Sequence, residues 1–259
     1  MKLIEENKMY DKLKRGEPVL GVQLRSRSVL IAEMMGYCGM DYVFIEGEHF
    51  AYDNQTIEDC IRAVQIGGAV PIVRVPSHEP GKILQVLESG AMGLFIPHVD
   101  TPEEAKELVD IVKYYPVGHR GFSDTSRATK FGTIPVKEYQ QMANNNVMLI
   151  AMIESRQAVE NVEGIIAAGV DMVVVGGKDL SEDMGYFGDM TDEVKAAIDK
   201  VRQAAKKAGI PFSGNSFASK EDFDWNVQNG GLMFSYTSDM VILQKALNEA
   251  VARFNSYKE

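Results

Sequence analysis

Ionisable side chains follow directly on several short apolar stretches of this sequence. In FIEGEH, residues 44–49, two carboxylates and an imidazole follow a run typical of a buried strand, and they belong to Glu46, Glu48 and His49. Carboxylates beside a histidine orient its ring and favour its protonated form, which suits general acid–base catalysis. The pattern predicts His49 as a catalytic base. The alternatives are a surface or structural role for His49, and a capping or bracing role for Glu48.

A single arginine interrupts the apolar run PIVRV at residues 71–75. If this run is a buried strand, Arg74 needs an anionic partner, because an unpaired buried charge is strongly destabilising. One candidate partner is Glu46. The other is a substrate carboxylate, which a guanidinium binds through two parallel hydrogen bonds.

Two further carboxylates stand at the ends of consecutive apolar runs. Glu154 ends VMLIAMIE, residues 147–154, and Asp179 follows MVVVGG, residues 172–177. Neighbouring parallel strands lie about 4.8 Å apart, so both side chains would reach the same edge of a sheet. Mg²⁺ and Mn²⁺ prefer such oxygen ligands and keep positions open for substrate. The pair predicts a divalent-metal site, with helix capping by Asp179 as the alternative.

The elements that must position these side chains alternate between apolar runs and stretches of helical period. The apolar runs are continuous, which indicates strands buried on both faces of a parallel sheet. Eight such runs, each followed by a helix, predict an α/β fold. The fold is a single-domain (β/α)8 TIM barrel over residues 1–259, with an additional N-terminal helix. A doubly wound sheet is disfavoured, because no GxGxxG follows the first run. The runs are residues 19–24, 42–46, 71–75, 93–99, 147–154, 172–177, 210–215 and 232–236.

Active sites of such barrels lie at the C-terminal ends of the strands. Besides the residues named above, these ends carry Arg25, His98, Asp100 and Asn215. All of these side chains are therefore expected on one face of the barrel.

Helical segments carry recognisable start and stop signals. Residues 101–115 begin with Thr101 as N-cap and Pro102 at the first helical position. Residues 192–209 end in basic side chains and a glycine. The intervening stretch 116–136 has little periodicity and is long for a connection in a compact domain, so it is predicted to be a functional or disordered loop.

Net charge, cysteine spacing and the lengths of the apolar runs indicate which binding partners and which cell compartment to expect. The net charge is −10 and no cluster of five or more Lys and Arg occurs, so nucleic acid and anionic membranes are poor partners. The two cysteines, Cys38 and Cys60, have no metal-like or redox spacing and are expected to be reduced. The N-terminus has no signal-peptide pattern, and no apolar run approaches the ~20 residues of a membrane span. A cytoplasmic protein is expected.

The chain resembles the HpcH/HpaI family of class II, metal-dependent pyruvate aldolases, in particular 4-hydroxy-2-oxoheptanedioate and 2-dehydro-3-deoxyglucarate aldolases. These are (β/α)8 barrels. The resemblance covers roughly residues 10–255, and its motifs are specific in their order and spacing. They are FIEGEH followed by DNQT, VRV around Arg74, VLESGAMGLFIPHVDTPEEA, GHRGFS, MIESRQAVENVEGI and VVVGGKDLSEDMG.

The resemblance implies a role for each matching residue. Glu154 and Asp179 match the metal-binding carboxylates. His49 matches the catalytic base, and Arg74 matches the arginine that contacts the pyruvate oxygen and stabilises the enolate. The segment Gly177–Asp179, which includes Lys178, matches the part that receives the pyruvate carboxylate.

Supporting positions depart from the family's usual residues. Glu46 and Glu88 stand where the family usually has aspartate, and Met152 stands where it has a hydrogen-bonding glutamine. Lys178 lies in GGKD, where the family has GPAD or GPSD, and places a cation beside the metal ligand. Arg120, in GHRG, keeps the family residue.

The resemblance further implies an activity and an assembly. It implies a carbon–carbon lyase that cleaves or forms 4-hydroxy-2-oxo acids through a pyruvate enolate, with Mg²⁺, Mn²⁺ or Co²⁺ and no organic cofactor. The small-molecule substrates are a 2-oxo acid and an aldehyde, and the aldehyde pocket is expected to include Arg25, the loop 116–136 and a neighbouring subunit. Arg120 and Arg127 either hold a distal anionic group of the substrate or form salt bridges within the loop. A dimer-based homohexamer with a C-terminal helix exchanged between subunits is also implied.

Other functions on the same scaffold remain open from sequence. One alternative is another metal–enolate reaction, such as oxaloacetate decarboxylation or citramalate- or citrate-lyase-like cleavage. The other is a non-catalytic relative that binds a 2-oxo acid.

Overall fold

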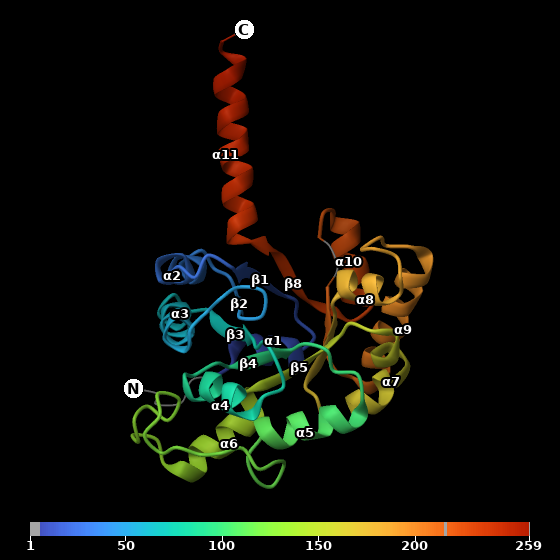
Figure 1. Ribbon diagram of the computed structural model, residues 1–259. Helices are drawn as coiled ribbons and strands as arrows, with labels where there is room; N and C mark the ends of the chain where they lie inside the picture. Colours follow the sequence, from blue (N-terminus) through green and yellow to red (C-terminus); the bar gives the residue numbers. More distant parts are fainter. Residues whose placement is uncertain (1–5, 215–216, 259) are drawn as a thin grey trace.

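Eight parallel strands close into a barrel in the order in which they occur along the chain (Figure 1). The computed structural model describes residues 6–214 and 217–258. Consecutive strands are hydrogen-bonded, and β8 pairs with β1 to complete the ring. The predicted (β/α)8 barrel is confirmed. The strands are β1 (Val19–Leu24), β2 (Tyr42–Glu46), β3 (Val70–Arg74), β4 (Gly93–Ile96), β5 (Met148–Ile153), β6 (Met172–Val175), β7 (Phe212–Ser213) and β8 (Gly231–Ser238).

Four strands, β4, β5, β6 and β7, are shorter than the sequence predicted, and β4 and β7 differ most from the predicted runs. β4 ends at Ile96 because Pro97 has no N–H to donate and His98 leaves the extended region with φ of 52°. β7 keeps only Phe212–Ser213 of the predicted run. Asn215, predicted at the end of this run, lies outside the described residues.

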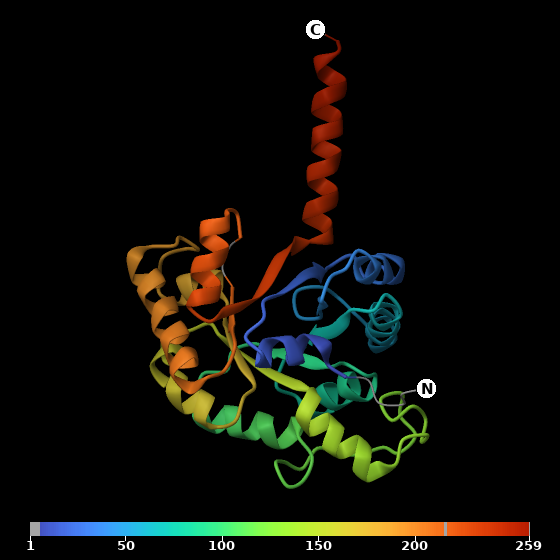
Figure 2. The ribbon, with the colours of Figure 1, turned by 180° about the vertical axis from the view of Figure 1, so that it is seen from behind.

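Helices surround the barrel, as the views from the two sides show (Figures 1 and 2). Thr101 and Glu104 form a capping box at the start of α5, which ends at Val112, before the predicted end at residue 115. The glycine predicted to stop α9 does so, because Gly209 adopts φ of 73°. The helices are α1 (Lys8–Lys14), α2 (Val29–Tyr37), α3 (Asn54–Ile66), α4 (Pro80–Glu88), α5 (Pro102–Val112), α6 (Val136–Asn146), α7 (Arg156–Ala167), α8 (Gly177–Asp183), α9 (Asp192–Ala208), α10 (Lys220–Gln228) and α11 (Asp239–Ser256).

The predicted N-terminal helix, α1, closes one end of the barrel interior. Its Met9 is fully buried among the side chains that fill the barrel. The Asn7 side chain donates a 3.0 Å hydrogen bond to the carbonyl of Met92, and the Tyr10 hydroxyl lies 2.9 Å from the carboxylate of Asp171. Met92 and Asp171 immediately precede β4 and β6. α1 therefore covers the N-terminal ends of the strands, and the interior opens at their C-terminal ends.

The long connection 116–136 lies between α5 and α6, as predicted, but not at the open end of the barrel. In a βα unit the helix runs back along its strand, so a segment that leaves the C-terminus of α5 starts at the end that α1 covers. No residue of this segment lines the cavity at the open end. The expectation that the loop builds a substrate pocket is therefore not met within this chain.

The C-terminal helix α11 projects away from the barrel (Figures 1 and 2). Asp239, at its start, accepts hydrogen bonds from the backbone N–H groups of Arg25 and Ser26 at 2.9 and 3.0 Å. Beyond this anchor many of its apolar side chains are exposed: Met240, Val241, Ile242, Leu243, Leu247, Val251 and Phe254. Within the described chain, no helix has the length and apolar character that a membrane span requires.

Candidate active site

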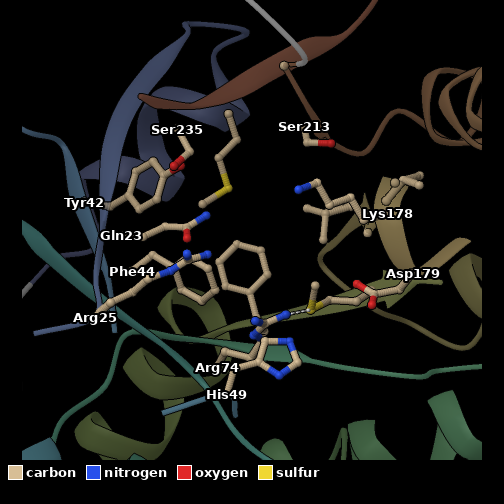
Figure 3. Close-up of a pocket in the computed structure, with 18 residues that line it drawn as sticks. Gln23, Arg25, Tyr42, Phe44, His49, Arg74, Lys178, Asp179, Ser213 and Ser235 are labelled. Carbon is tan, nitrogen blue, oxygen red and sulfur yellow. Dashed lines mark hydrogen bonds between the residues drawn. The ribbon is translucent and has the colours of Figure 1, made fainter. Parts of the chain in front are cut away.

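A cavity of about 500 Å³ opens at the C-terminal ends of the strands (Figure 3). This volume is in the range of small-molecule sites. Phe44 and Phe95 form an aromatic part of its wall, with ring centroids 4.5 Å apart. Most residues that the sequence placed in the site line this cavity: His49, Arg74, Met152, Gly177, Lys178 and Asp179.

Arg74 is held by two carboxylates. It faces Glu46 in the register of β2 and β3. Its Nε donates a 2.9 Å hydrogen bond to Oε1 of Glu46, its Nη2 donates to Oε2, and its Nη1 lies 3.0 Å from Oε2 of Glu48. Of the two partners considered from sequence, Glu46 is therefore present in the structure. The fork of hydrogen bonds fixes the plane of the guanidinium at the cavity wall.

Glu46 is fully buried, and both of its carboxylate oxygens accept hydrogen bonds. Besides Arg74, its Oε1 accepts from the backbone N–H of Glu48 at 3.1 Å and of His49 at 3.4 Å. Burial raises the pKa of Glu46. The hydrogen bonds and charge of Arg74, together with the two backbone N–H groups, lower the pKa by more than burial raises it, so the pKa is below its usual value. Glu46 is thus an ionised brace for Arg74 and for the turn that carries His49.

His49 follows this turn and reaches the cavity beside Arg74 (Figure 3). Its side chain is 58% exposed, and its Nε2 lies 3.7 Å from Oε2 of Glu48. Gly47 permits the close turn, because a Cβ there would lie 2.5 Å from the carbonyl oxygen of Arg74. The imidazole is therefore accessible to a ligand and lies next to a carboxylate, as general acid–base catalysis requires.

Glu154 places a carboxylate at the end of β5. Its side chain is 2% exposed, and its Oε2 accepts a 3.0 Å hydrogen bond from the backbone N–H of His98. Burial raises the pKa of Glu154, the hydrogen bond and charge of His98 oppose this, and the negative charges of Asp179 and Glu48 raise the pKa further. Gly176 makes room for the carboxylate, because a Cβ at this position would lie 2.3 Å from Oε1.

The donors around Glu154 fit a hard divalent cation. Among the described residues no three His, Cys, Asp or Glu side chains are grouped as a metal site. Glu154 and Asp179 are nevertheless close enough to interact electrostatically, and Asp179 lines the cavity. Mg²⁺ commonly takes only one or two protein carboxylates and completes its shell with water and substrate. A cation here would also offset the repulsion between the carboxylates.

His98 belongs to the site, although the sequence predicted only its place at a strand end and no role. Its Nδ1 lies 3.6 Å from Oε2 of Glu154, and its Nε2 lies 3.8 Å from Oε1 of Glu48. The left-handed backbone at His98 brings its N–H to Glu154. The feature of the sequence that could have indicated this role is the pair Pro97 and His98 at the end of an apolar run.

Of the remaining residues that were expected to support the site, one contacts it and two lie away from it. Met152 contacts the site, with its sulfur 4.0 Å from Nη1 of Arg74. Glu88 and Arg120 do not reach this cavity, because Glu88 ends α4 and therefore lies toward the opposite end of the barrel. Arg120 is buried there, with its Nη2 3.4 Å from both Oε1 of Glu88 and the hydroxyl of Tyr139. This salt bridge joins the loop to α4, so it is not the salt bridge within the loop that was one of the two roles expected of Arg120.

The barrel, the open cavity and the charged groups at its strand ends define a TIM-barrel enzyme of the carbon–carbon lyase class. The chain belongs to the HpcH/HpaI aldolase/citrate lyase family, whose model matches residues 20–246. The resemblance seen in the sequence motifs is confirmed, and divalent-metal dependence is a general property of this family.

Known relatives cover most of the chain. It is 38% identical over 212 residues to a hydroxypyruvate/pyruvate aldolase from Agrobacterium fabrum, covering 79% of each protein. It is 34% identical over 258 residues to a 4-hydroxy-2-oxo-heptane-1,7-dioate aldolase from Shigella sonnei, covering 97% of this chain and 96% of that one.

Solved structures of similar proteins have the same fold over nearly the whole chain. A family member from Burkholderia cenocepacia superposes with a TM-score of 0.87 at 30% identity, covering 96% of this chain and 99% of that one. The citrate synthase SbnG superposes with a TM-score of 0.88 at 27% identity, covering 98% and 99%.

Proposed function

We propose that the protein is a divalent-metal-dependent aldolase that forms and cleaves 4-hydroxy-2-oxo acids through the enolate of pyruvate. The observation that carries the proposal is the grouping of His49, a fixed arginine and Asp179 at one cavity, with the buried carboxylate of Glu154 close enough to Asp179 to interact electrostatically. The aldolase names of the relatives support the same chemistry.

Glu154 and Asp179 are the proposed metal ligands, and Mg²⁺, Mn²⁺ and Co²⁺ suit them. When bound, such a cation supplies Lewis-acid polarisation of the 2-oxo acid. Gly176 keeps Glu154 in position for this role. The backbone N–H groups of Gly177, Lys178 and Asp179 begin α8, have no acceptor within that helix, and are the proposed donors to the pyruvate carboxylate.

His49 is the proposed base that removes a proton from the pyruvate methyl group. In the reverse direction its protonated ring returns that proton. Arg74 donates hydrogen bonds to the pyruvate ketone oxygen, which becomes negative as the proton leaves. Glu46 holds the guanidinium in one orientation, so little reorganisation is needed during the reaction. Glu48 braces both His49 and Arg74.

The proposed assembly is a dimer-based homohexamer in the cytoplasm, in which each chain forms one domain and α11 is exchanged with a neighbour. The exposed apolar side chains of α11 support an exchange, because an isolated helix with such a surface gains stability only by packing. The small-molecule partners are a 2-oxo acid and an aldehyde.

Pyruvate release from a 4-hydroxy-2-oxo acid tests the activity. Wild-type protein with Mn²⁺ is expected to release pyruvate, EDTA to stop the release, and His49→Ala to reduce kcat by about 10²-fold or more. His119→Ala is a matched control, because this exposed histidine pairs with Asp110 on α5 and does not line the cavity. Oxaloacetate decarboxylation without any aldol cleavage would instead support the decarboxylase alternative.

A further inference from the structure

Met152 places a thioether against the arginine that is proposed to stabilise the enolate. It lies near the end of β5, and its largely buried side chain lines the cavity. Its sulfur is 4.0 Å from Nη1 of Arg74, and Figure 3 draws this contact as a dashed line from the arginine. The sulfur therefore borders both the cavity and the proposed oxyanion donor.

Arg74 has little hydrogen-bonding capacity left for a ligand. Its Nε and Nη2 donate to Glu46, and its Nη1 lies 3.0 Å from Oε2 of Glu48. Nη1 carries two N–H groups, and within residues 6–214 and 217–258 its other acceptor is the sulfur of Met152. Because a thioether is a weak acceptor, this second N–H stays available to a substrate oxygen.

Oxidation of Met152 changes this contact from weak to strong. Methionine sulfoxide carries a polar S=O group in place of the apolar thioether. An oxygen added to the sulfur on the side of Nη1 lies within hydrogen-bond distance of a cationic donor, and charge-assisted hydrogen bonds are the stronger kind. The sulfoxide thus occupies the N–H that the enolate oxygen needs, and it places a second negative partial charge beside that oxygen.

A small oxidant has access to this sulfur. The cavity holds about 500 Å³ and opens at the C-terminal ends of the strands, so a hydroperoxide can enter it. Met233 lines the same cavity, but in the described part of the chain no donor contacts its sulfur. Met152 is therefore the cavity methionine whose oxidation alters a hydrogen bond of Arg74.

We propose that Met152 is a modification site at which a hydroperoxide inactivates the enzyme. The sulfur lone pair attacks the terminal peroxide oxygen, so that an S–O bond forms and the O–O bond breaks. The proton of the transferred oxygen passes to the leaving oxygen, which departs as water or an alcohol. Sulfur loses two electrons and the peroxide gains them. This proposal rests on the proposed aldolase function, because it concerns the donor to the enolate.

The test treats Mg²⁺-loaded protein with hydrogen peroxide, removes the peroxide with catalase and adds Mn²⁺ for the assay. Peptide mass spectrometry gives the oxidised fraction at each methionine, and deuterium exchange of the pyruvate methyl protons gives the activity. The exchange rate of wild type is expected to fall in proportion to the fraction of chains oxidised at Met152, since loss of an oxyanion donor lowers a rate by about 10²-fold or more.

Three variants separate this modification from general damage, each compared with its own untreated rate. Met152→Leu is expected to stay within about twofold of that rate, because leucine fills a similar volume without an oxidisable sulfur. Met152→Gln, whose amide can donate a hydrogen bond, is expected to resist peroxide as well, which separates oxidation from polarity. Met34→Leu is the matched control, because Met34 is exposed on α2 and does not line the cavity, so this variant should be inactivated like wild type.

Inactivation of Met152→Leu at the wild-type rate overturns the proposal. So does full activity of wild-type protein that carries the sulfoxide at Met152, or a dose that inactivates wild type while Met152 remains unoxidised. Failure of the aldolase function itself is distinct, because untreated wild-type protein would then exchange no pyruvate protons, and the proposal would fall with it.

Discussion

Arg74 and Glu46 face each other across β3 and β2 and are joined by two hydrogen bonds, so the arginine enters the cavity in a fixed orientation. Glu46 is also bound by the N–H groups of Glu48 and His49. One buried carboxylate thus sets the positions of both the proposed base and the proposed oxyanion donor.

Arg74→Lys keeps the positive charge but removes the fork. A lysine offers a single ammonium and cannot bind both oxygens of Glu46 while pointing at a ligand. We expect kcat for aldol cleavage to fall by about 10²- to 10³-fold, as on removal of an oxyanion donor. Arg62→Lys, at a surface pair with Glu58 and Asp59, is the control and should retain wild-type kcat. Equal rates for Arg74→Lys and wild type would rule out the hydrogen-bond role.

Glu46→Gln tests the pH dependence of this pair. Because the pKa of Glu46 is lowered in the folded state, its contribution to stability is fully present above the unfolded-state value of 4.5 and is lost as pH falls through the folded-state pKa. The variant leaves Arg74 short of a buried partner, so the free energy of unfolding at pH 7 should fall by about 3 kcal/mol.

The same variant should lose less stability than wild type when the pH is lowered below 4.5, since the titrating group is gone. Urea unfolding at a series of pH values measures both effects. An identical acid-side loss in the two proteins would contradict an ionised Glu46 in the folded state.

Glu154→Gln separates metal binding from folding. The charge of Glu154 is buried near Asp179 and Glu48, so the substitution should leave the melting temperature of metal-free protein equal or higher. Mn²⁺ should raise the melting temperature of wild type but not of the variant, because binding to the folded state alone stabilises it. Calorimetric titration with Mn²⁺ gives the affinity directly. An unchanged affinity would exclude Glu154 as a ligand.

Replacing Leu243 and Leu247 by aspartate tests the assembly. Both side chains are exposed on α11, and charge on this surface should prevent helix exchange. We expect light scattering after gel filtration to show a hexamer for wild type and a smaller species for the double variant. Asn248→Asp together with Glu249→Gln, on polar positions of the same helix, is the control that should remain hexameric. A monomeric wild type would contradict the proposed assembly.

The barrel could be predicted because its signals are local. Continuous apolar runs, the capping box at Thr101 and the stop at Gly209 each depend on neighbours in the sequence. Strand ends are also local features, so the arrival of Arg74 and Asp179 at one cavity followed from the fold class. The short β7 differs from prediction because proline and glycine flank it and limit its pairing.

Pairing choices and loop placement could not be predicted in the same way. The partner of Arg74 depended on the register of two strands, which the sequence left open. The role of His98 depends on a left-handed backbone conformation that is uncommon for residues other than glycine. The loop 116–136 was expected to help build the aldehyde pocket, whereas its position follows from the direction of α5.

Exchange of the pyruvate methyl protons for deuterium, followed by NMR, tests the central claim most directly, because it needs no aldehyde. The account predicts exchange by wild type with Mn²⁺, no exchange with EDTA, and a loss of about 10²-fold or more in His49→Ala but not in His119→Ala. Pyruvate that binds without exchanging under any divalent metal, or full exchange by His49→Ala, would contradict it.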